Sequence, residues 1–404
     1  MDEPTSRERM LQAISHVEPD RVPFCYMIFE LLRTKCRDDY EFVERQLEMG
    51  LDATVALPMF GVHAAEGEHD VRTLPVKYHP DVEIRERVEE RAGAPYPVLV
   101  KEYHTPAGVL TAKVNKTNDW PFGNQIPLMD DYLVPRSRKF LIEDEGDLSA
   151  LRYLLVPPRS SDVRVFHRQS ARARKFAAQH GVMVTGGWGV GIEAAIWLCG
   201  LRSTMIAAIQ RPGFVQELAE ILHAWNVKRM AVFLNEGVDL YIRRGWYENT
   251  HFWSPQLFRR FVLPYLKAEV RTAHRAGAKF GYIMTSGCMP LLDMFIEAGI
   301  DVLIGVDPVQ GKGTDLEKMK AMLQGRVCLW GGVNGYITVE MGKKDAVQAA
   351  VSTAIRTLAP SGGFILSPVD NVRDTSEKTW QNVEAMLRTW ERLAEYPYLH
   401  PHGG

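Results

Sequence analysis

The chain has 404 residues and a formal net charge of −2 at pH 7, with 46% hydrophobic and 24% charged residues. This composition is ordinary for a globular protein, and the small net charge produces no field that attracts nucleic acid or an anionic membrane surface. No apolar run approaches the ~18 residues that span a bilayer. We therefore expect a folded protein without nucleic-acid or membrane partners.

The start of the chain and its cysteines predict a cytoplasmic location. The first residues lack the apolar stretch of a secretory signal peptide. The cysteines are scattered, odd in number and without a CxxC pair, which is typical of reduced thiols. They are Cys25, Cys36, Cys199, Cys288 and Cys328.

The N-terminal part predicts two helices and two strands. Apolar residues at helical spacing favour a helix over residues 5–15, and a second helix is expected over residues 40–49. The apolar run 22–29 is the first predicted strand, with Glu30 at its end. Residues 52–57 form the second predicted strand.

Residues 71–135 have a different pattern. Segments such as VEIRERVEERAG and YPVLVKEYHTPAG alternate in polarity and break at glycine or proline, which is typical of antiparallel hairpins. We predict that this segment is an insertion after the second strand, folded over the mouth of the main domain as a lid or a dimer contact.

The rest of the chain alternates short apolar runs with helical patterns. Strands alternating with helices indicate a parallel sheet, and eight strands in all are the number that closes a TIM-type (β/α)8 barrel. An open doubly wound sheet is the alternative, but no GxGxxG follows the first strand. We predict one α/β barrel domain over residues 1–404, whose later strands are 182–185, 239–243, 279–284, 301–305, 326–330 and 363–366.

The candidate site residues follow the predicted strands, because the loops at the carboxyl ends of barrel strands build the active site. They combine arginines, carboxylates, indoles and small polar groups. The set is Glu30, Trp188, Arg243, Arg244, Trp246, Glu248, Asn249, Met284, Ser286, Cys288, Asp307, Gln310, Asn334 and Asp370.

Several stretches together resemble the uroporphyrinogen decarboxylase and corrinoid methyltransferase superfamily. They are RERMLQAISHVEPDRVPF, SPQLFRRFVLPYLKAEVRTAHRAGAKFGYI, MPLLDMFIEAGIDVLIGVDPVQ, the GGVNG turn and SGGFILSPVDNVRDTSEKTWQNVEAM. The resemblance covers nearly the whole chain. It implies a TIM-type barrel whose site lies at the C-terminal mouth.

The chain departs from both chemistries of that superfamily. The arginine-rich signature of the decarboxylases is missing, with only Arg33 nearby, and their aspartate is absent from residues 57–60. The HxCG zinc motif of the methyltransferases would fall on Met284 to Gly287, and their later cysteine near Asp370. The resemblance therefore leaves zinc uncertain, and a shifted site that uses Cys288 with a nearby carboxylate stays open.

The candidate residues suggest roles at the mouth. Because side chains alternate along a strand, only one of Arg243 and Arg244 faces the interior, either as an anchor for a substrate anion or as an internal ion pair to Glu30, Glu248 or Asp307. Asp307, Asp370 or Glu248 is the expected general acid or base, with loop capping as the alternative. Trp188 and Trp246 either stack on a flat ligand or pack in the core.

The predicted function is a corrinoid-dependent methyltransferase that demethylates a small, anionic, methoxylated or methylated substrate. The resemblance implies a corrinoid such as cobalamin, free or on a partner protein, because no DxHxxG run occurs in the chain. A homodimer is left open. The alternatives are a decarboxylase acting on a porphyrinogen or another acid, and a barrel that binds a small molecule without catalysis.

Overall fold

The parallel sheet of the protein is a barrel-like layer of seven strands. The computed structural model describes residues 3–57, 74, 76–90 and 92–396. The order is β1-β6-β7-β8-β9-β10-β11, with every neighbouring pair parallel. This confirms the TIM-like α/β fold. The strands are β1 (Thr54–Ala56), β6 (Met183–Gly189), β7 (Leu240–Arg244), β8 (Lys279–Ile283), β9 (Val302–Val306), β10 (Cys328–Asn334) and β11 (Phe364–Val369).

The first predicted strand is wrong as a continuous strand. Residues 22–29 instead make isolated bridges, and they lie between β11 and the start of β1. Cys25 N–H donates to Leu366 O at 3.0 Å, while Asp52 N–H donates to Phe24 O at 2.9 Å. The segment contains a proline, which has no N–H for a regular ladder. It thus occupies the eighth position of the barrel without regular strand geometry.

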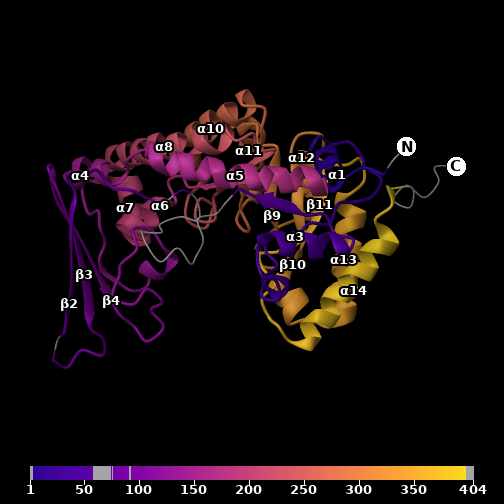
Figure 1. Cartoon of the computed structure of the whole chain (residues 1–404), viewed down its shortest axis with the longest axis horizontal. Coiled ribbons are helices and arrows are strands. Elements are labelled where there is room, and N and C mark those ends of the chain that lie inside the picture. Colours follow the sequence, from indigo (N-terminus) through magenta and orange to yellow (C-terminus); the bar gives the residue numbers. More distant parts are fainter. Residues whose placement is uncertain (1–2, 58–73, 75, 91, 397–404) are drawn as a thin grey trace.

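Helices cover the outside of the sheet, as crossover connections between parallel strands require. Figure 1 shows the long helices α5 and α8 running lengthwise, with α13 and α14 near the two termini. The helices are α1 (Ser6–Ile14), α2 (Glu30–Arg33), α3 (Asp39–Glu48), α4 (Asp147–Leu154), α5 (Ser160–His180), α6 (Ala194–Cys199), α7 (Leu201–Gln210), α8 (Pro212–Leu234), α9 (Pro255–Phe261), α10 (Leu263–Arg275), α11 (Leu292–Ala298), α12 (Leu316–Leu323), α13 (Lys344–Leu358) and α14 (Glu377–Leu393), with short helical turns η1 (Asp131–Leu133), η2 (Met289–Leu291) and η3 (Gly335–Glu340).

The barrel interior is a packed apolar cluster rather than a channel. Helix α1 closes its amino end: Thr5 caps this helix in a reciprocal capping box with Glu8, and Met10 and Ile14 enter the cluster. At the other end the half-buried Met27, Trp188 and Trp246 lie against it. The buried members are Met10, Ala13, Ile14, Cys25, Met183, Leu240, Ile242, Ile283, Val302, Ile304, Cys328, Trp330 and Ile365.

The predicted insertion carries three strands of a four-stranded antiparallel sheet, which confirms the hairpin pattern; the fourth strand, β5, follows the predicted end at residue 135. The order of the sheet is β2-β3-β4-β5, and Figure 1 shows it at the end of the molecule away from both termini. Residues 71–73, 75 and 91 of the predicted insertion lie outside the described residues, and its role as a lid or dimer contact stays a prediction. The strands are β2 (Glu83–Glu89), β3 (Val98–Thr105), β4 (Gly108–Asn115) and β5 (Ser137–Lys139). Within the described part of the chain, every helix is too short or too polar to cross a membrane.

Candidate active site

Two indole rings form the floor of the mouth. Trp188 lies at an irregularity in β6, where the pairing with β7 shifts between Gly187 and Gly189, and its backbone is in the left-handed region at φ 62°. Bulges of this kind redirect a side chain next to a site. The ring of Trp188 lies 5.7 Å from that of Trp246, tilted by 51°, and both side chains are half-buried. They offer two partly exposed apolar rings, tilted against each other, above the packed interior.

Arg244 is the arginine that faces the interior. On β7 it is in register with Leu240 and Ile242, both members of the interior cluster. Its guanidinium carbon lies 5.0 Å from the ring centre of Trp197 and 4.7 Å from that of Trp246, at cation–π distance from both. Although the residue is only 8% exposed, it retains some access to solvent. Arg244 therefore places one positive charge at the floor of the mouth.

Glu193 is the counter-ion of Arg244. Its Oε1 lies 3.5 Å from Arg244 Nε, and Tyr247 N–H donates to its Oε2 at 3.3 Å. Burial raises the pKa of Glu193 to about 7, against the opposing effect of Arg244 and with a smaller contribution from the Glu248 carboxylate. Oε1 has no hydrogen-bond partner among the described residues. Near neutral pH this acid therefore exists in both protonation states.

Sequence reasoning missed Glu193 and Trp197. Both lie in the run EAAIWLC just after β6, which is apolar apart from this one acid. A lone carboxylate in such a run, close behind a strand, was the available signal. Asp131 of η1 was missed as well. It accepts hydrogen bonds from Trp197 Nε1 at 2.9 Å and from the Tyr247 hydroxyl at 2.8 Å, so the segment before β5 supports the site.

Arg243 points to the opposite side of β7, toward the helices. Its Nη2 donates to both oxygens of Glu248 at 2.8 and 3.0 Å, and its Nε lies 3.3 Å from Glu269 of α10. The Tyr282 hydroxyl donates to Glu248 Oε2 at 2.5 Å. Burial raises the pKa of Glu248, and Arg243 opposes that rise. Arg243 and Glu248 therefore form the internal ion pair that was one of the sequence alternatives.

Three further candidates form one hydrogen-bonded group on the rim. Asn334 Nδ2 donates to Asp307 Oδ2 at 2.7 Å and to Gln310 Oε1 at 2.8 Å. The other oxygen of Asp307 accepts from the backbone N–H groups of Val309 and Gln310. Asn334 also caps η3 by accepting from Ile337 N–H at 2.5 Å. This group fixes the loops after β9 and β10 relative to each other, and both Asp307 oxygens are occupied by protein donors.

The remaining polar candidates lie at the strand ends and make no recorded contact with Arg244 or Glu193. Asn249 donates to Trp246 O at 2.5 Å and lies 3.5 Å from Ser286 Oγ. Glu30 begins α2 and is half-buried, and Asp370 is exposed directly after β11. The structure thus brings the candidates together in separate groups.

Met284 and Cys288 lie away from the mouth. Both are buried in the outer core between sheet and helices. Among the described residues, no group of three or more His, Cys, Asp or Glu side chains is arranged to hold a metal ion. A zinc ion needs such a set of thiolate, imidazole or carboxylate ligands. The residues at these positions therefore do not fit zinc.

The Cys288 thiol is expected to resist alkylation in the folded protein. Burial raises its pKa to about 11, and only the thiolate reacts, so about one thiol in a thousand is ionised near pH 8. Mass spectrometry after iodoacetamide treatment should find Cys288 unmodified until urea is added. The half-buried Cys36 serves as the internal comparison, and rapid labelling of native Cys288 would contradict this picture.

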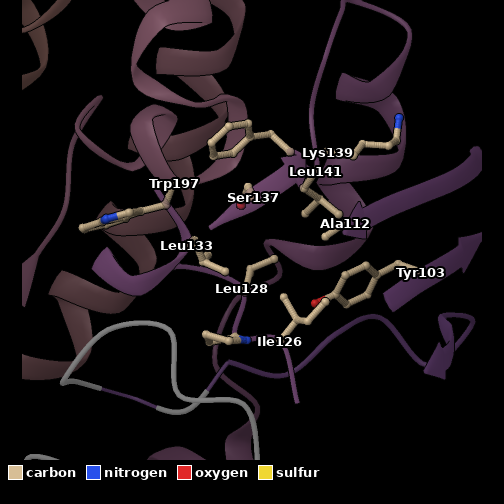
Figure 2. A pocket seen from close by; sticks show the side chains of 11 residues that line it. Tyr103, Ala112, Ile126, Leu128, Leu133, Ser137, Lys139, Leu141 and Trp197 are labelled. Atoms are coloured by element: carbon tan, nitrogen blue, oxygen red, sulfur yellow. The ribbon is translucent and has the colours of Figure 1, made fainter. Parts of the chain in front are cut away.

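A small pocket lies beside this site, in the insertion. Figure 2 shows its lining side chains, most of which are apolar and come from the antiparallel sheet and the chain that leads to β5. Tyr103, Ile126 and Leu133 are among them. Trp197 also lines it and so borders both the pocket and Arg244. The polar chemistry nevertheless lies at Arg244 and Glu193, not in the pocket.

Comparison with solved structures finds one similar fold over nearly the whole chain and further matches over about half of it. A methyltransferase from Methanosarcina mazei has a similar fold, with a TM-score of 0.60 and 18% identity over 96% of this chain and 99% of that chain. A B12-independent methionine synthase from a Shewanella species, in complex with selenomethionine, reaches a TM-score of 0.38 and 11% identity over 56% of this chain and 65% of that chain. No curated protein matches the sequence.

The family assignment comes from the sequence itself. The uroporphyrinogen decarboxylase (URO-D) family matches residues 129–392, which include the strands β6 to β11 and every residue of the Arg244 site described above. The matched region also contains Glu193, Trp197 and the rim group. The chain therefore belongs to the uroporphyrinogen decarboxylase (URO-D) family.

Proposed function

We propose that this URO-D family protein is a methyltransferase that removes a methyl group from a small methoxylated or methylated carboxylic acid. The observation that carries the proposal is Arg244, whose guanidinium faces the mouth between two indoles beside an acid with a pKa near neutrality. The likeness in fold to a methyltransferase supports it.

Arg244 would bind the carboxylate of the substrate. A guanidinium pairs with a carboxylate through two parallel hydrogen bonds, which fix orientation as well as position. Because Arg243 is buried on the helix side of β7 and ion-paired with Glu248 and Glu269, the mouth offers one guanidinium, which suits one carboxylate better than a polyanionic tetrapyrrole.

Glu193 would supply the proton that the reaction needs. Breaking the bond between methyl carbon and oxygen leaves the electron pair on oxygen, and a placed acid accelerates such a step by protonating that atom. The protonated form of Glu193 is available near pH 7. Asp307, the sequence candidate, has both oxygens engaged by N–H donors of the rim.

A corrinoid is the proposed methyl acceptor, and it would supply a nucleophilic cobalt centre when bound. The half-buried ring of Trp188 would stack on one face of the flat macrocycle, and the ring of Trp246 stands beside it at an angle of 51°. The indole N–H of Trp246 is buried without a hydrogen-bond partner among the described residues, so a donor is left for a ligand. These two residues would hold the group.

The test is demethylation of 2-methoxybenzoate, whose ether oxygen lies beside the carboxylate, by the purified protein with chemically reduced cobalamin. We expect release of 2-hydroxybenzoate, measured by chromatography, together with a change in the cobalamin absorbance. Arg244→Gln should lower kcat/KM about 10- to 150-fold, the effect of losing a hydrogen bond to a charged group. Arg37→Gln, at an exposed arginine paired with Glu41, is the matched control.

Two results would contradict the proposal. If the acid loses carbon dioxide and is not demethylated, the protein is a decarboxylase and not a methyltransferase. Equal activity of Arg244→Gln and the wild type would remove Arg244 from the site.

A further inference from the structure

The ionised side chains around Arg244 form one buried cluster, which we call the buried ionic cluster. It contains two arginines from β7 and three glutamates from three different segments. None of the five is more than 8% exposed. The members are Arg243, Arg244, Glu193, Glu248 and Glu269.

We propose that an anion bound by Arg244 enters together with one proton, which Glu193 takes up, so that binding selects a monoanionic carboxylate and prepares the acid. This inference rests on the proposed function and concerns the same site. It predicts a measurable proton count for binding, independent of any turnover.

The charge composition of the cluster is the first argument. Three carboxyl groups face two guanidinium groups, so the fully ionised cluster carries one excess negative charge in a buried position. A buried charge without a partner is costly and is usually neutralised by a proton. The cluster without ligand is therefore already close to accepting a proton.

The arrival of a substrate carboxylate adds a second negative charge next to Glu193. Both carboxylates would share the guanidinium of Arg244, since Glu193 Oε1 lies 3.5 Å from its Nε. Two carboxylates in one site raise the proton affinity of one of them. Protonation of Glu193 relieves the repulsion and leaves Arg244 to the ligand.

Other groups around Glu193 are less able to take the proton. Glu248 is held by Arg243 and by the Tyr282 hydroxyl of β8. Tyr282 and Tyr247 stay neutral, because burial raises the pKa of each phenol, and Tyr247 in turn donates to Asp131.

Glu269 and its neighbour complete the list of facing groups. Glu269 of α10 pairs with Arg243 on one side and lies 3.0 Å from His223 Nδ1 of α8 on the other. Glu193 differs from both other glutamates because it alone pairs with Arg244, the guanidinium that faces the mouth, whereas Glu248 and Glu269 pair with Arg243. The structure therefore assigns the proton to Glu193.

The same arrangement limits the charge of the ligand. A dianion would need a second guanidinium, but Arg243 faces the helices and is paired twice. The added negative charge would then meet Glu193 and Glu248 without compensation. The class of ligand that fits is a planar monocarboxylate.

The experiment is calorimetric titration of the wild-type protein with benzoate at about pH 8, in phosphate and in Tris buffer. The two buffers differ in ionisation enthalpy, so the difference in heat counts protons. Since Glu193 has a pKa of about 7, it is mostly ionised at this pH, and we expect uptake of close to one proton per benzoate. Below about pH 6 the acid is already protonated and the uptake should vanish.

A second measurement on the wild type does not depend on any variant folding. If one proton enters with the ligand, the Kd for benzoate should rise by up to about tenfold per pH unit above pH 8. Benzamide, which has no charge, should show no such dependence.

Three variants separate the possible results. Glu193→Gln should bind benzoate without taking up a proton. His223→Gln should bind benzoate and still take up the proton. If proton uptake is lost only in His223→Gln, the assignment of the proton to Glu193 is wrong. Benzoate binding without proton uptake by the wild type would overturn this inference and leave the proposed function standing. If the wild type binds no benzoate, or if Arg244→Gln binds benzoate as well as the wild type does, the proposed function is wrong, and this inference falls with it.

Discussion

Replacing Arg243 by methionine is expected to lower the free energy of unfolding by about 3–5 kcal/mol, which is the effect of removing one partner from a buried ion pair. The change leaves Glu248 and Glu269, both fully buried, without their shared guanidinium. Methionine has a similar length, so little volume is lost. Urea unfolding followed by tryptophan fluorescence would measure the difference.

Two controls identify the cause of this loss. Arg37→Met removes a surface arginine paired with Glu41 and should leave the stability nearly unchanged, because solvent screens an exposed pair. Adding Glu248→Gln and Glu269→Gln to Arg243→Met removes the unpaired charges and should recover part of the stability. If the triple variant is no more stable than Arg243→Met, the cost lies in packing and not in charge.

Replacing Glu193 by glutamine is expected to lower kcat about 10²- to 10⁴-fold, the usual contribution of a placed general acid. Glutamine keeps the shape of the side chain and can still accept a hydrogen bond from Tyr247 N–H, but its amide does not act as an acid near neutral pH. The variant leaves Arg244 without its counter-ion, so urea unfolding should accompany the kinetics to separate a loss of the acid from a loss of stability. Single-turnover demethylation of 2-methoxybenzoate would measure the effect.

The pH dependence gives the sharper test of Glu193. An acid acts while it is protonated, so wild-type kcat/KM should fall as the pH rises through about 7, the pKa of Glu193 in the free protein. Because the bound anion raises the proton affinity of Glu193, the fall in kcat should lie at higher pH. Glu193→Gln should lose both features, and a variant that retains the wild-type profile would show that another group is the acid.

The sequence predicts the parallel strands of the barrel well, because each is a short apolar run followed by a helical pattern. It fails at residues 22–29, where composition favours a strand but a proline interrupts the ladder. That failure is local. The segment still pairs with its neighbours through Cys25 and Asp52, so the architecture is unaffected.

The site is harder to predict, because it depends on which way each side chain faces. Alternation indicates that one of Arg243 and Arg244 points inward, but only the register with Leu240 and Ile242 decides which. Glu193 was missed for a related reason. Its unusual pKa arises from burial among distant segments, which no local pattern reveals.

The alternation of β7 separates two tasks between adjacent residues. Arg243 holds the outer helices to the sheet through its ion pairs, whereas Arg244 presents its charge at the mouth. No direct contact between the two side chains is recorded. A change at position 244 can therefore alter ligand preference without disturbing the ion pairs that support the sheet. An insertion or deletion of one residue within the strand would exchange the two tasks, so diversification of this site should proceed by substitution and not by changes in strand length.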